Sequence, residues 1–522
     1  MKELFKKYIP DDAKVSYDTK TAIFEVSAAD IREVVSNLLK KHLSLKLIDA
    51  TDERADDGGF RVWYVFGVPG DDLFVMPFIC LDDGDTLPSL AGITVAALNY
   101  ERKIQEFFGI KLTGHPNPQR LLLHENWPDD AFPLRKDFNW NKRPKTATGT
   151  YKFQSVKSEG IYEIPVGPIH AGIIEPGHFR FSVAGESIML LEARLGFVHK
   201  GTEKLFEGQT LEKMVKLSEK ISGDSSFSHS LAFCQAIEQL AGIVVPERAK
   251  YLRTIYAELE RLANHVGDIG FMMLDTGFNF GGSQGARLRE MVMRINDRLT
   301  GSRFLRGVNS IGGVTQDISG DVATGLAKEL DDLLKDFSEL IEIAEDSAAL
   351  LNRLKGTGPL PHHIAKDYGA LGVPARAVGI ATDARAEHPY AAYDQLSLGP
   401  IATAESGDVY ARFSVRVQEV RSAVKIIQQA IESVPDGPIR AKVPAAIELK
   451  PNAVALGIVE GWRGEIVHFI RTDSDGQINR VAVRDPSFIN WQVVGYCGAN
   501  QVVPDFPLIN KSFNLSYTGH DL

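Results

Sequence analysis

Apolar and polar positions in the first part of the chain alternate at short range, which is typical of a small domain of mixed helices and strands. Ser27 and Asp30 can cap a helix, and apolar residues then recur three and four positions apart on one face. That face consists of Ile31, Val34, Val35, Leu38 and Leu39. Strand-like runs follow at residues 45–48, 60–68 and 74–81, with Asp and Gly turns between them. We therefore expect a small α+β domain.

The second part of the chain has the longer apolar period of helices. The three clearest sets are Ile255, Leu259, Leu262 and Val266; Leu326, Leu330, Leu333, Phe337 and Leu340; and Phe413, Val417, Val420, Val424, Ile427 and Ile431. Long helices joined by Gly-rich turns predict a large bundle. Near the end, residues 465–471 and 477–484 flank an Asp-Ser-Asp-Gly turn, which predicts a β-hairpin that decorates the bundle.

The two parts are separated by residues 139–151, NWNKRPKTATGTY, which have no hydrophobic period and read as a linker. The predicted fold class is α+β. An N-terminal α+β docking domain (1–138) precedes the linker (139–151). A large, mainly α-helical domain with a small β element near the C-terminus follows (152–522).

Composition narrows the function classes. A formal charge of -10 without a long basic run argues against nucleic-acid binding and against a polybasic membrane anchor. No stretch reaches the roughly 20 apolar residues of a spanning helix, and the start MKELFKKYIP lacks the apolar core of a signal peptide. We expect a soluble, cytoplasmic chain.

Two further classes of site lack support in the sequence. Cys80, Cys234 and Cys497 are far apart with no CxxC, so we expect each to be a small buried residue rather than part of a disulfide or zinc framework. No GxGxxG follows a predicted strand, so nicotinamide chemistry would belong to a partner. The GTGPLP stretch at residues 356–361 is interpreted as a turn.

Residues 101–138 read ERKIQEFFGIKLTGHPNPQRLLLHENWPDDAFPLRKDF. This run, with its FFGI turn, its GHP and its final PLRKDF, is similar to the C-type hydrophilic subunit of complex I (NADH:quinone oxidoreductase). The resemblance implies a docking domain without a cofactor. The exposed Pro, His and Arg groups of the run suit binding to another subunit, and the run contains no cluster of metal ligands.

The second part resembles the D-type hydrophilic subunit of complex I and, more closely, the large subunit of energy-converting nickel–iron hydrogenases such as that of formate hydrogenlyase. The motifs that carry this resemblance occur in order. They are GPIH (167–170), EPGHFRF (175–181), LGFVHKGTEKL (195–205), SHSLAFCQAIEQL (228–240), ELERLANHVGDIG (258–270), EGWRGEI (460–466) and VRDPSFINWQ (483–492). Together, the two resemblances cover nearly the whole chain.

The family pattern places two CxxC pairs around nickel and iron, because soft thiolates hold these metals in low oxidation states. Here the positions of the first pair are Ser222 and Ser225, and those of the second pair are Ser516 and Gly519. A serine hydroxyl has a much higher pKa than a thiol and is a hard donor, so we expect no nickel–iron centre and no metal in this chain.

In complex I the equivalent cavity takes the quinone headgroup, lined by a His of the GPxHPSTHG turn and a Tyr. The resemblance implies that His170 keeps the first role, whereas the continuation is HAGIIEPGH and the Tyr position is Gly223. The quinone-protonating pair is therefore incomplete.

The candidate lining of the cavity combines carboxylates, histidines and one arginine, which can relay protons or hold an anionic acceptor. It consists of His170, His178, Arg180, Glu203, Asp224 and His229, with Ser222 and Ser225. Asp224 and His229 would lie about 140° apart on a regular helix, which disfavours a direct pair. His178, Arg180 and Glu203 can instead form structural ion pairs or hydrogen bonds, and His229 can be a core histidine. The serines can simply start a helix, and no convincing base is at hand to make one of them a nucleophile.

The resemblance implies a redox-module subunit of an ion-translocating complex, peripheral at the cytoplasmic face of the cell membrane. Its expected partners are an iron–sulfur small subunit, a ferredoxin-like subunit and membrane-arm subunits, but no nucleic acid. The iron–sulfur cluster would lie on the small subunit, this chain would bind no cofactor of its own, and quinone is one candidate acceptor. Two alternatives remain open: a non-catalytic scaffold, and a hydrogenase large subunit with unusual ligands.

Overall fold

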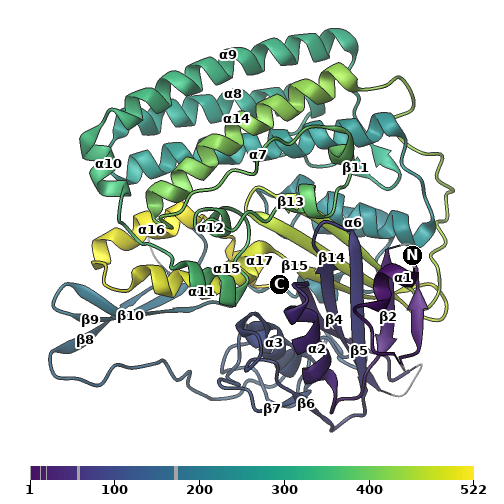
Figure 1. Ribbon diagram of the computed structural model, residues 1–522. Coiled ribbons are helices and arrows are strands. Elements are labelled where there is room, and N and C mark those ends of the chain that lie inside the picture. Colours follow the sequence, from purple (N-terminus) through teal and green to yellow (C-terminus); the bar gives the residue numbers. More distant parts are fainter. Residues whose placement is uncertain (1, 12, 19, 56–58, 170–173) are drawn as a thin grey trace.

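The computed structural model describes residues 2–11, 13–18, 20–55, 59–169 and 174–522 (Figure 1). Its helices and strands confirm the α+β class. A layer of long helices lies on one side, and the N-terminal sheet lies on the other (Figure 1).

The N-terminal part contains one five-stranded sheet with the order β1-β2-β5-β4-β3, in which only β2 and β5 run parallel. The elements of the whole N-terminal part are α1 (Lys2–Lys6), β1 (Val15–Tyr17), β2 (Thr21–Glu25), α2 (Ile31–Lys40), β3 (Ser44–Asp52), β4 (Phe60–Val68), β5 (Leu73–Leu81), β6 (Thr86–Pro88), α3 (Leu98–Phe108) and β7 (Lys111–Thr113). The three predicted strands are thus confirmed. In α2 the residues Ile31, Val35 and Leu38 are buried, whereas Ser27 lies in the turn before the helix and Asp30 takes the N-cap position.

Four long helices form the bundle: α7 (Glu247–Asp275), α8 (Asn279–Thr300), α9 (Gly320–Glu345) and α14 (Val409–Ser433). The predicted apolar positions of these helices are buried, apart from the half-buried Ile431. Helices α7 and α8 approach each other very closely. A Cβ added to Gly270 would lie only 2.9 Å from the Cα of Gly285. Glycine at these positions therefore sets the packing distance of the two helices.

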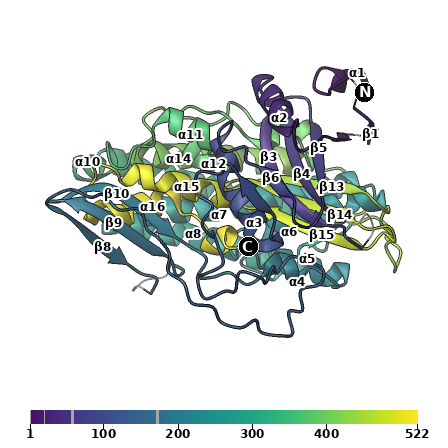
Figure 2. The same cartoon turned by 90° about the horizontal axis from the view of Figure 1, so that it is seen from below.

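The expected hairpin exists as part of the sheet β13-β14-β15, with bounds Val454–Gly461, Gly464–Thr472 and Ile478–Arg484. Its predicted position on the outside of the bundle is wrong. One face, with Leu456 and Phe469, belongs to the core of the N-terminal part, and the other, with Ala455 and Ile470, packs on α6 (Ser226–Ala241). Both faces of the sheet are apolar, and each is covered by a different part of the chain. The sheet is therefore a central layer between the two parts (Figure 2).

Several buried charged residues of this central sheet pair with β3 or with the residue that follows it. Lys46 lies 2.6 Å from Glu465, and Arg480 lies 2.8 Å from Asp49. Arg471 lies 3.2 Å from Glu53, which follows the end of β3. Such pairs tolerate burial because each charge has a partner.

The remaining elements complete the second part of the chain. A sheet with the order β10-β9-β8 projects from the body beside the C-terminal helices (Figures 1 and 2). The bounds are β8 (Ile161–Val166), β9 (His178–Ala184), β10 (Ser187–Arg194), α4 (Thr202–Leu205), α5 (Leu211–Ser218), β11 (Asn309–Ser310), β12 (Gly313–Val314), α10 (Ala348–Leu354), α11 (His362–Tyr368), α12 (Gly372–Arg376), α13 (Ala384–Glu387), α15 (Pro486–Gly498), α16 (Phe506–Phe513) and α17 (Tyr517–His520). The GTGPLP stretch is the turn between α10 and α11, as predicted. Within the described ranges, every helix is too short or too polar to cross a bilayer.

The burial prediction for the cysteines holds for Cys234 and Cys497 and is wrong for Cys80, which is exposed. Cys80 lies on β5 between the buried Ile79 and Leu81, so the alternation of the strand turns its side chain outward.

Candidate functional site

The four positions predicted from the family pattern come together where the start of α6 meets α17. Ser222 precedes α6 and Ser225 takes its N-cap position, while Ser516 caps α17 and Gly519 lies within it. The Oγ atoms of Ser222 and Ser516 are 3.0 Å apart, and the backbone N–H of Gly519 donates to Ser516 Oγ at 2.9 Å. A hydrogen bond thus joins two segments that are 294 residues apart.

Arg463, in the turn between β13 and β14, organises this cluster. Its guanidinium donates to both carboxylate oxygens of Asp224, at 2.6 and 2.7 Å, and lies 3.4 Å from the hydroxyls of Ser222 and Ser225. Burial opposes ionisation of Asp224, but the charge and hydrogen bonds of Arg463 outweigh it and hold the pKa of this carboxyl below its usual value. About a third of the Asp224 side chain is exposed (35%), so the cluster is accessible there.

Asp485 occupies the space that a side chain at position 519 would need. A Cβ on Gly519 would lie 2.5 Å from the Asp485 Cγ. Asp485 accepts from Nε2 of His229 at 3.0 Å, and Nδ1 of His229 lies 3.2 Å from Nε2 of His468. Because a carboxylate only accepts, a neutral His229 carries its proton on Nε2 and accepts from His468 on Nδ1. Asp224 and His229 therefore have different partners, and because Asp224 lies in the turn before α6, the angle expected on a regular helix does not apply to this pair.

This donor set does not fit a nickel–iron centre. The three side chains at the ligand positions are hydroxyls that bond to Asp224, Arg463 and one another, and the fourth position is blocked by Asp485. Hard, neutral oxygens are poor ligands for soft metals.

The start of α6 is capped by a carboxylate rather than by the serines. Ser225 takes the N-cap position, but its side chain makes no capping hydrogen bond. Instead, Glu260 of α7 accepts from the backbone N–H groups of Phe227 at 2.7 Å and Ser228 at 3.1 Å. Burial raises the pKa of Glu260 to about 7 in spite of these bonds.

Two other predicted residues have structural partners outside the serine cluster. Arg180 pairs with Glu163 at 3.0 Å and covers the ring of Phe153. Glu203 is buried between Lys103 at 2.8 Å and Arg480 at 2.7 Å, and the positive charges of both keep its pKa low against the effect of burial.

His178 begins β9, and its Nδ1 lies 3.1 Å from the carbonyl oxygen of Gly167. The EPGH turn before it packs beside α17, where Glu175 accepts from the backbone N–H of Thr518 at 3.2 Å. His170 lies outside the described residues.

Sequence reasoning missed Arg463, Asp485 and His468 as members of the site. Arg463 and Asp485 stand in the EGWRGEI and VRDPSFINWQ motifs, so the motifs were the available signal. His468 lies on β14 within an apolar run, and only its contact with His229 reveals it.

One group of possible metal ligands lies elsewhere in the described chain: Glu387, His388 and Glu465. Lys46 lies 2.6 Å from Glu465 and 3.6 Å from Glu387, and Arg484 also bonds to Glu465. The two carboxylates are thus already neutralised by two cations, which leaves little attraction for a metal ion.

Comparisons with known proteins identify the family of the chain. The family model described as "Respiratory-chain NADH dehydrogenase, 30 Kd subunit" matches residues 24–144. The model described as "Respiratory-chain NADH dehydrogenase, 49 Kd subunit" matches residues 275–455 and 448–521. The chain is therefore a fusion of the two subunit types.

Individual relatives match all or most of the chain. Formate hydrogenlyase subunit 5 of Escherichia coli is 32% identical over 529 residues, covering 100% of this chain and 92% of that protein. The fused C/D component of the NADH-quinone oxidoreductase of Phocaeicola vulgatus is 32% identical and covers 74% and 78%. The carbon monoxide-induced hydrogenase of Rhodospirillum rubrum is 33% identical and covers 68% and 97%. The chain belongs to this family of complex I and hydrogenase subunits, and it is a hydrophilic module subunit of the oxidoreductase type.

Proposed function

We propose that this chain is the redox-module subunit of a membrane-bound, ion-translocating oxidoreductase complex that works without a nickel–iron centre. Electrons pass from an iron–sulfur cluster of a small subunit to an acceptor, of which quinone is the candidate, at the cluster formed by Ser222, Asp224, Arg463 and Ser516. The observation that carries the proposal is that Ser222, Ser516 and Arg463 meet in one hydrogen-bonded cluster, while Asp485 fills the space beside Gly519.

The chemistry of the cluster suits an acceptor that gains negative charge on reduction. Arg463 is a fixed cation with directed donors, and the exposed part of Asp224 marks the accessible side. His229 and Asp485 form a buried hydrogen-bonded pair nearby, which can hold a proton for the reduced acceptor.

The names of the relatives support the proposed assembly, since they include formate hydrogenlyase and NADH-quinone oxidoreductase subunits. By analogy, this chain contacts an iron–sulfur small subunit, a ferredoxin-like subunit and membrane-arm subunits, and it is peripheral at the cytoplasmic face of the membrane. The projecting β8–β10 sheet supports such contacts, because Tyr162 and Met189 on it are exposed apolar residues.

A scaffold without electron transfer at its own site is the second candidate. It is favoured by the burial of the cluster, in which Ser222, Ser516 and Asp485 are each at most 5% exposed and bonded to one another or to neighbours.

The test is to purify the complex from membranes, measure nickel by elemental analysis and follow quinone-dependent oxidation of its iron–sulfur clusters. We expect no nickel and quinone-linked oxidation that slows at least about tenfold in Arg463→Lys, since lysine cannot form the two-pronged contact with Asp224. Arg353→Lys is the matched control, because Arg353 forms a surface pair with Asp505.

Each other outcome selects an alternative. Stoichiometric nickel would establish a hydrogenase with unusual ligands. Absence of both nickel and quinone-linked oxidation would leave the scaffold. Equal rates in wild type and Arg463→Lys would place the acceptor elsewhere.

A further inference from the structure

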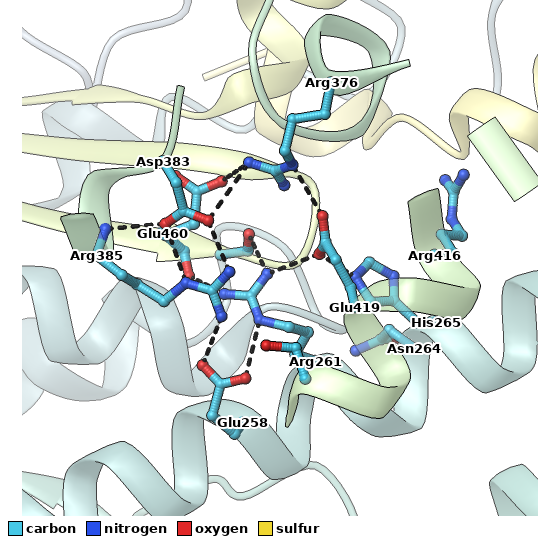
Figure 3. Close-up of polar contacts among 12 residues, drawn as sticks. Glu258, Arg261, Asn264, His265, Arg376, Asp383, Arg385, Arg416, Glu419 and Glu460 are labelled. Atoms are coloured by element: carbon cyan, nitrogen blue, oxygen red, sulfur yellow. Dashed lines mark hydrogen bonds and ion pairs between the residues drawn. The ribbon is translucent and has the colours of Figure 1, made fainter. Parts of the chain in front are cut away.

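A second buried polar cluster, distinct from the serine site, lies between the helical bundle and the central sheet (Figure 3). Every member is at most 5% exposed. The ionisable members are Glu258, Arg261 and His265 of α7, Arg376 of α12, Asp383 and Arg385 around the start of α13, Glu419 of α14 and Glu460 of β13.

Arginines bridge the carboxylates in this ion cluster. Arg376 forms an ion pair with Glu419 at 2.8 Å and donates a hydrogen bond to Glu460 at 2.9 Å. Arg385 joins Asp383 at 2.6 Å to Glu258 at 3.0 Å.

Arg261 lies 3.2 Å from Glu258 and 3.4 Å from Glu419. His265 lies 2.7 Å from Glu419, and burial lowers its pKa.

The charges of the cluster do not balance. It contains four carboxylates and three guanidinium groups, while the lowered pKa of His265 favours the neutral ring. An uncompensated charge in a buried site is costly, so the cluster favours the uptake of one proton.

Glu460 is the member best placed to carry this proton. Arginines keep the pKa of Glu258, Asp383 and Glu419 below the usual value against burial, with His265 adding to the effect at Glu419. Burial, and then the negative charge of Asp383, raises the pKa of Glu460 to about 7, against Arg376 and Arg261. The remaining hydrogen bond of the Glu460 carboxylate is from the backbone N–H of Ala384, at 3.0 Å.

Glu460 also lines a cavity of about 470 Å³ between the N-terminal part and residues 362–387. The other charged groups around this cavity include Lys46 of β3, Glu465 of β14 and Arg484 of β15, which pair with one another, and Glu387 beside Lys46. His362, Lys366 and Asp367 of α11 and Asp383 complete its charged lining. The cavity therefore reaches the ion cluster at Asp383 and Glu460.

We propose that Glu460 is a proton-exchange site. Its carboxyl takes up one proton from solvent and releases it to solvent through this cavity. The proton passes between the carboxyl oxygen and water, and no electron moves. The site is independent of the proposed electron transfer, although it borders the same turn: Arg463 is three residues further on, and the indole of Trp462 donates to the backbone oxygen of Asp224 at 3.0 Å.

The test is infrared titration of the full-length chain between about pH 5 and 9, following the carboxylic-acid C=O band. Glu260 and Glu101 also have pKa values raised to about 7 by burial, and burial raises the pKa of other carboxyls such as Glu219 and Glu387, so several groups contribute to the band. Glu460→Gln, which imitates the protonated form, should remove the share of one carboxyl from the titrating amplitude, measured as the difference from wild type. Glu260→Gln is the matched control and should leave the Glu460 component in place.

Two further measurements complete the test. Asp383→Asn should retain the Glu460 component but move its midpoint to lower pH, because this variant lacks the neighbouring negative charge. If Glu460→Gln does not fold, the midpoint of Asp383→Asn decides the question. Transfer of wild type to D₂O should shift the band within minutes. Full amplitude in Glu460→Gln, an unmoved midpoint in Asp383→Asn, or a Glu460 component that resists D₂O would each overturn the proposal.

Discussion

At the scale of single residues, the serine cluster offers hydroxyls, a carboxylate and a guanidinium rather than thiolates. The cluster has its own internal bonds, between Ser222 and Ser516 and from Arg463 to Asp224. At position 519, Asp485 occupies the space beside the backbone. Placing a side-chain ligand there therefore requires Asp485 to move, not merely a change of side chain.

Gly519→Ala tests this steric conflict. The new methyl group would lie 2.5 Å from Asp485 Cγ, so we expect destabilisation of about 1–3 kcal/mol, as for other overpacked sites. Urea unfolding measures the change. Gly325→Ala is the control, because Gly325 lies on the exposed side of α9 with open space around it, and it should be neutral or stabilising by up to about 1 kcal/mol. Equal effects of the two substitutions would contradict the steric interpretation.

Much of this site could not be predicted from local pattern. The motifs led to Ser222, Ser225, Ser516 and Gly519, and the structure brings these positions together. Arg463 and Asp485 come from turns more than 200 residues from Ser222, and no periodicity links them to it. Arg180 and Glu203 looked equally suited to the site, but their partners Glu163 and Arg480 hold them elsewhere.

At the scale of elements, the start of α6 depends on a carboxylate supplied by another helix. Glu260 of α7 satisfies the orphan N–H groups of Phe227 and Ser228. Because burial raises its pKa to about 7, the folded protein binds this proton more tightly than the unfolded chain does. This contribution to stability is complete below the unfolded pKa of about 4.5 and is lost as pH rises through 7.

Glu260→Gln should therefore become more stable relative to wild type as pH increases from 5 to 8, by at most about 3 kcal/mol. The glutamine cannot ionise and keeps an acceptor for the helix start. Urea unfolding at a series of pH values measures the difference. A constant difference across this range would contradict the raised pKa.

Close packing of α7 on α8 is a second property of elements. Gly270→Ala places a methyl 2.9 Å from the backbone of Gly285, so we expect the helices to separate and stability to fall by about 1–3 kcal/mol or more. Thermal unfolding measures the change in stability. Gly325→Ala, on the exposed side of α9, is the comparison. An increase in stability for both variants would show that helix propensity, rather than the contact, dominates.

At the scale of the whole molecule, the central sheet packs on both parts of the chain, so we expect the two parts to unfold as one cooperative body. Helix periods predicted the bundle well, because spacing of three and four is a local property. The place of β13–β15 could not be predicted, since a strand with two apolar faces reveals only that both are covered, not by what. Its covering comes from α6 on one side and from the N-terminal core on the other, which joins distant parts of the sequence.

Substitution in the buried pair of Arg480 and Asp49 tests whether the two parts unfold together. Arg480→Met leaves Asp49 and Glu203 with fewer buried cations, so we expect a loss of about 3–5 kcal/mol, against less than about 1 kcal/mol for Arg353→Met on the surface. Because both parts pack on the sheet, the loss of stability should lower the unfolding midpoint reported by every probe by the same amount. The fluorescence of a dye on the exposed Cys80, in the N-terminal sheet, and the far-UV helix signal should show one shared midpoint in wild type and one lower, shared midpoint in the variant. Separate midpoints for the two probes would mean that the N-terminal part is a tethered domain, and the buried ion pairs would then connect two bodies rather than stabilise one.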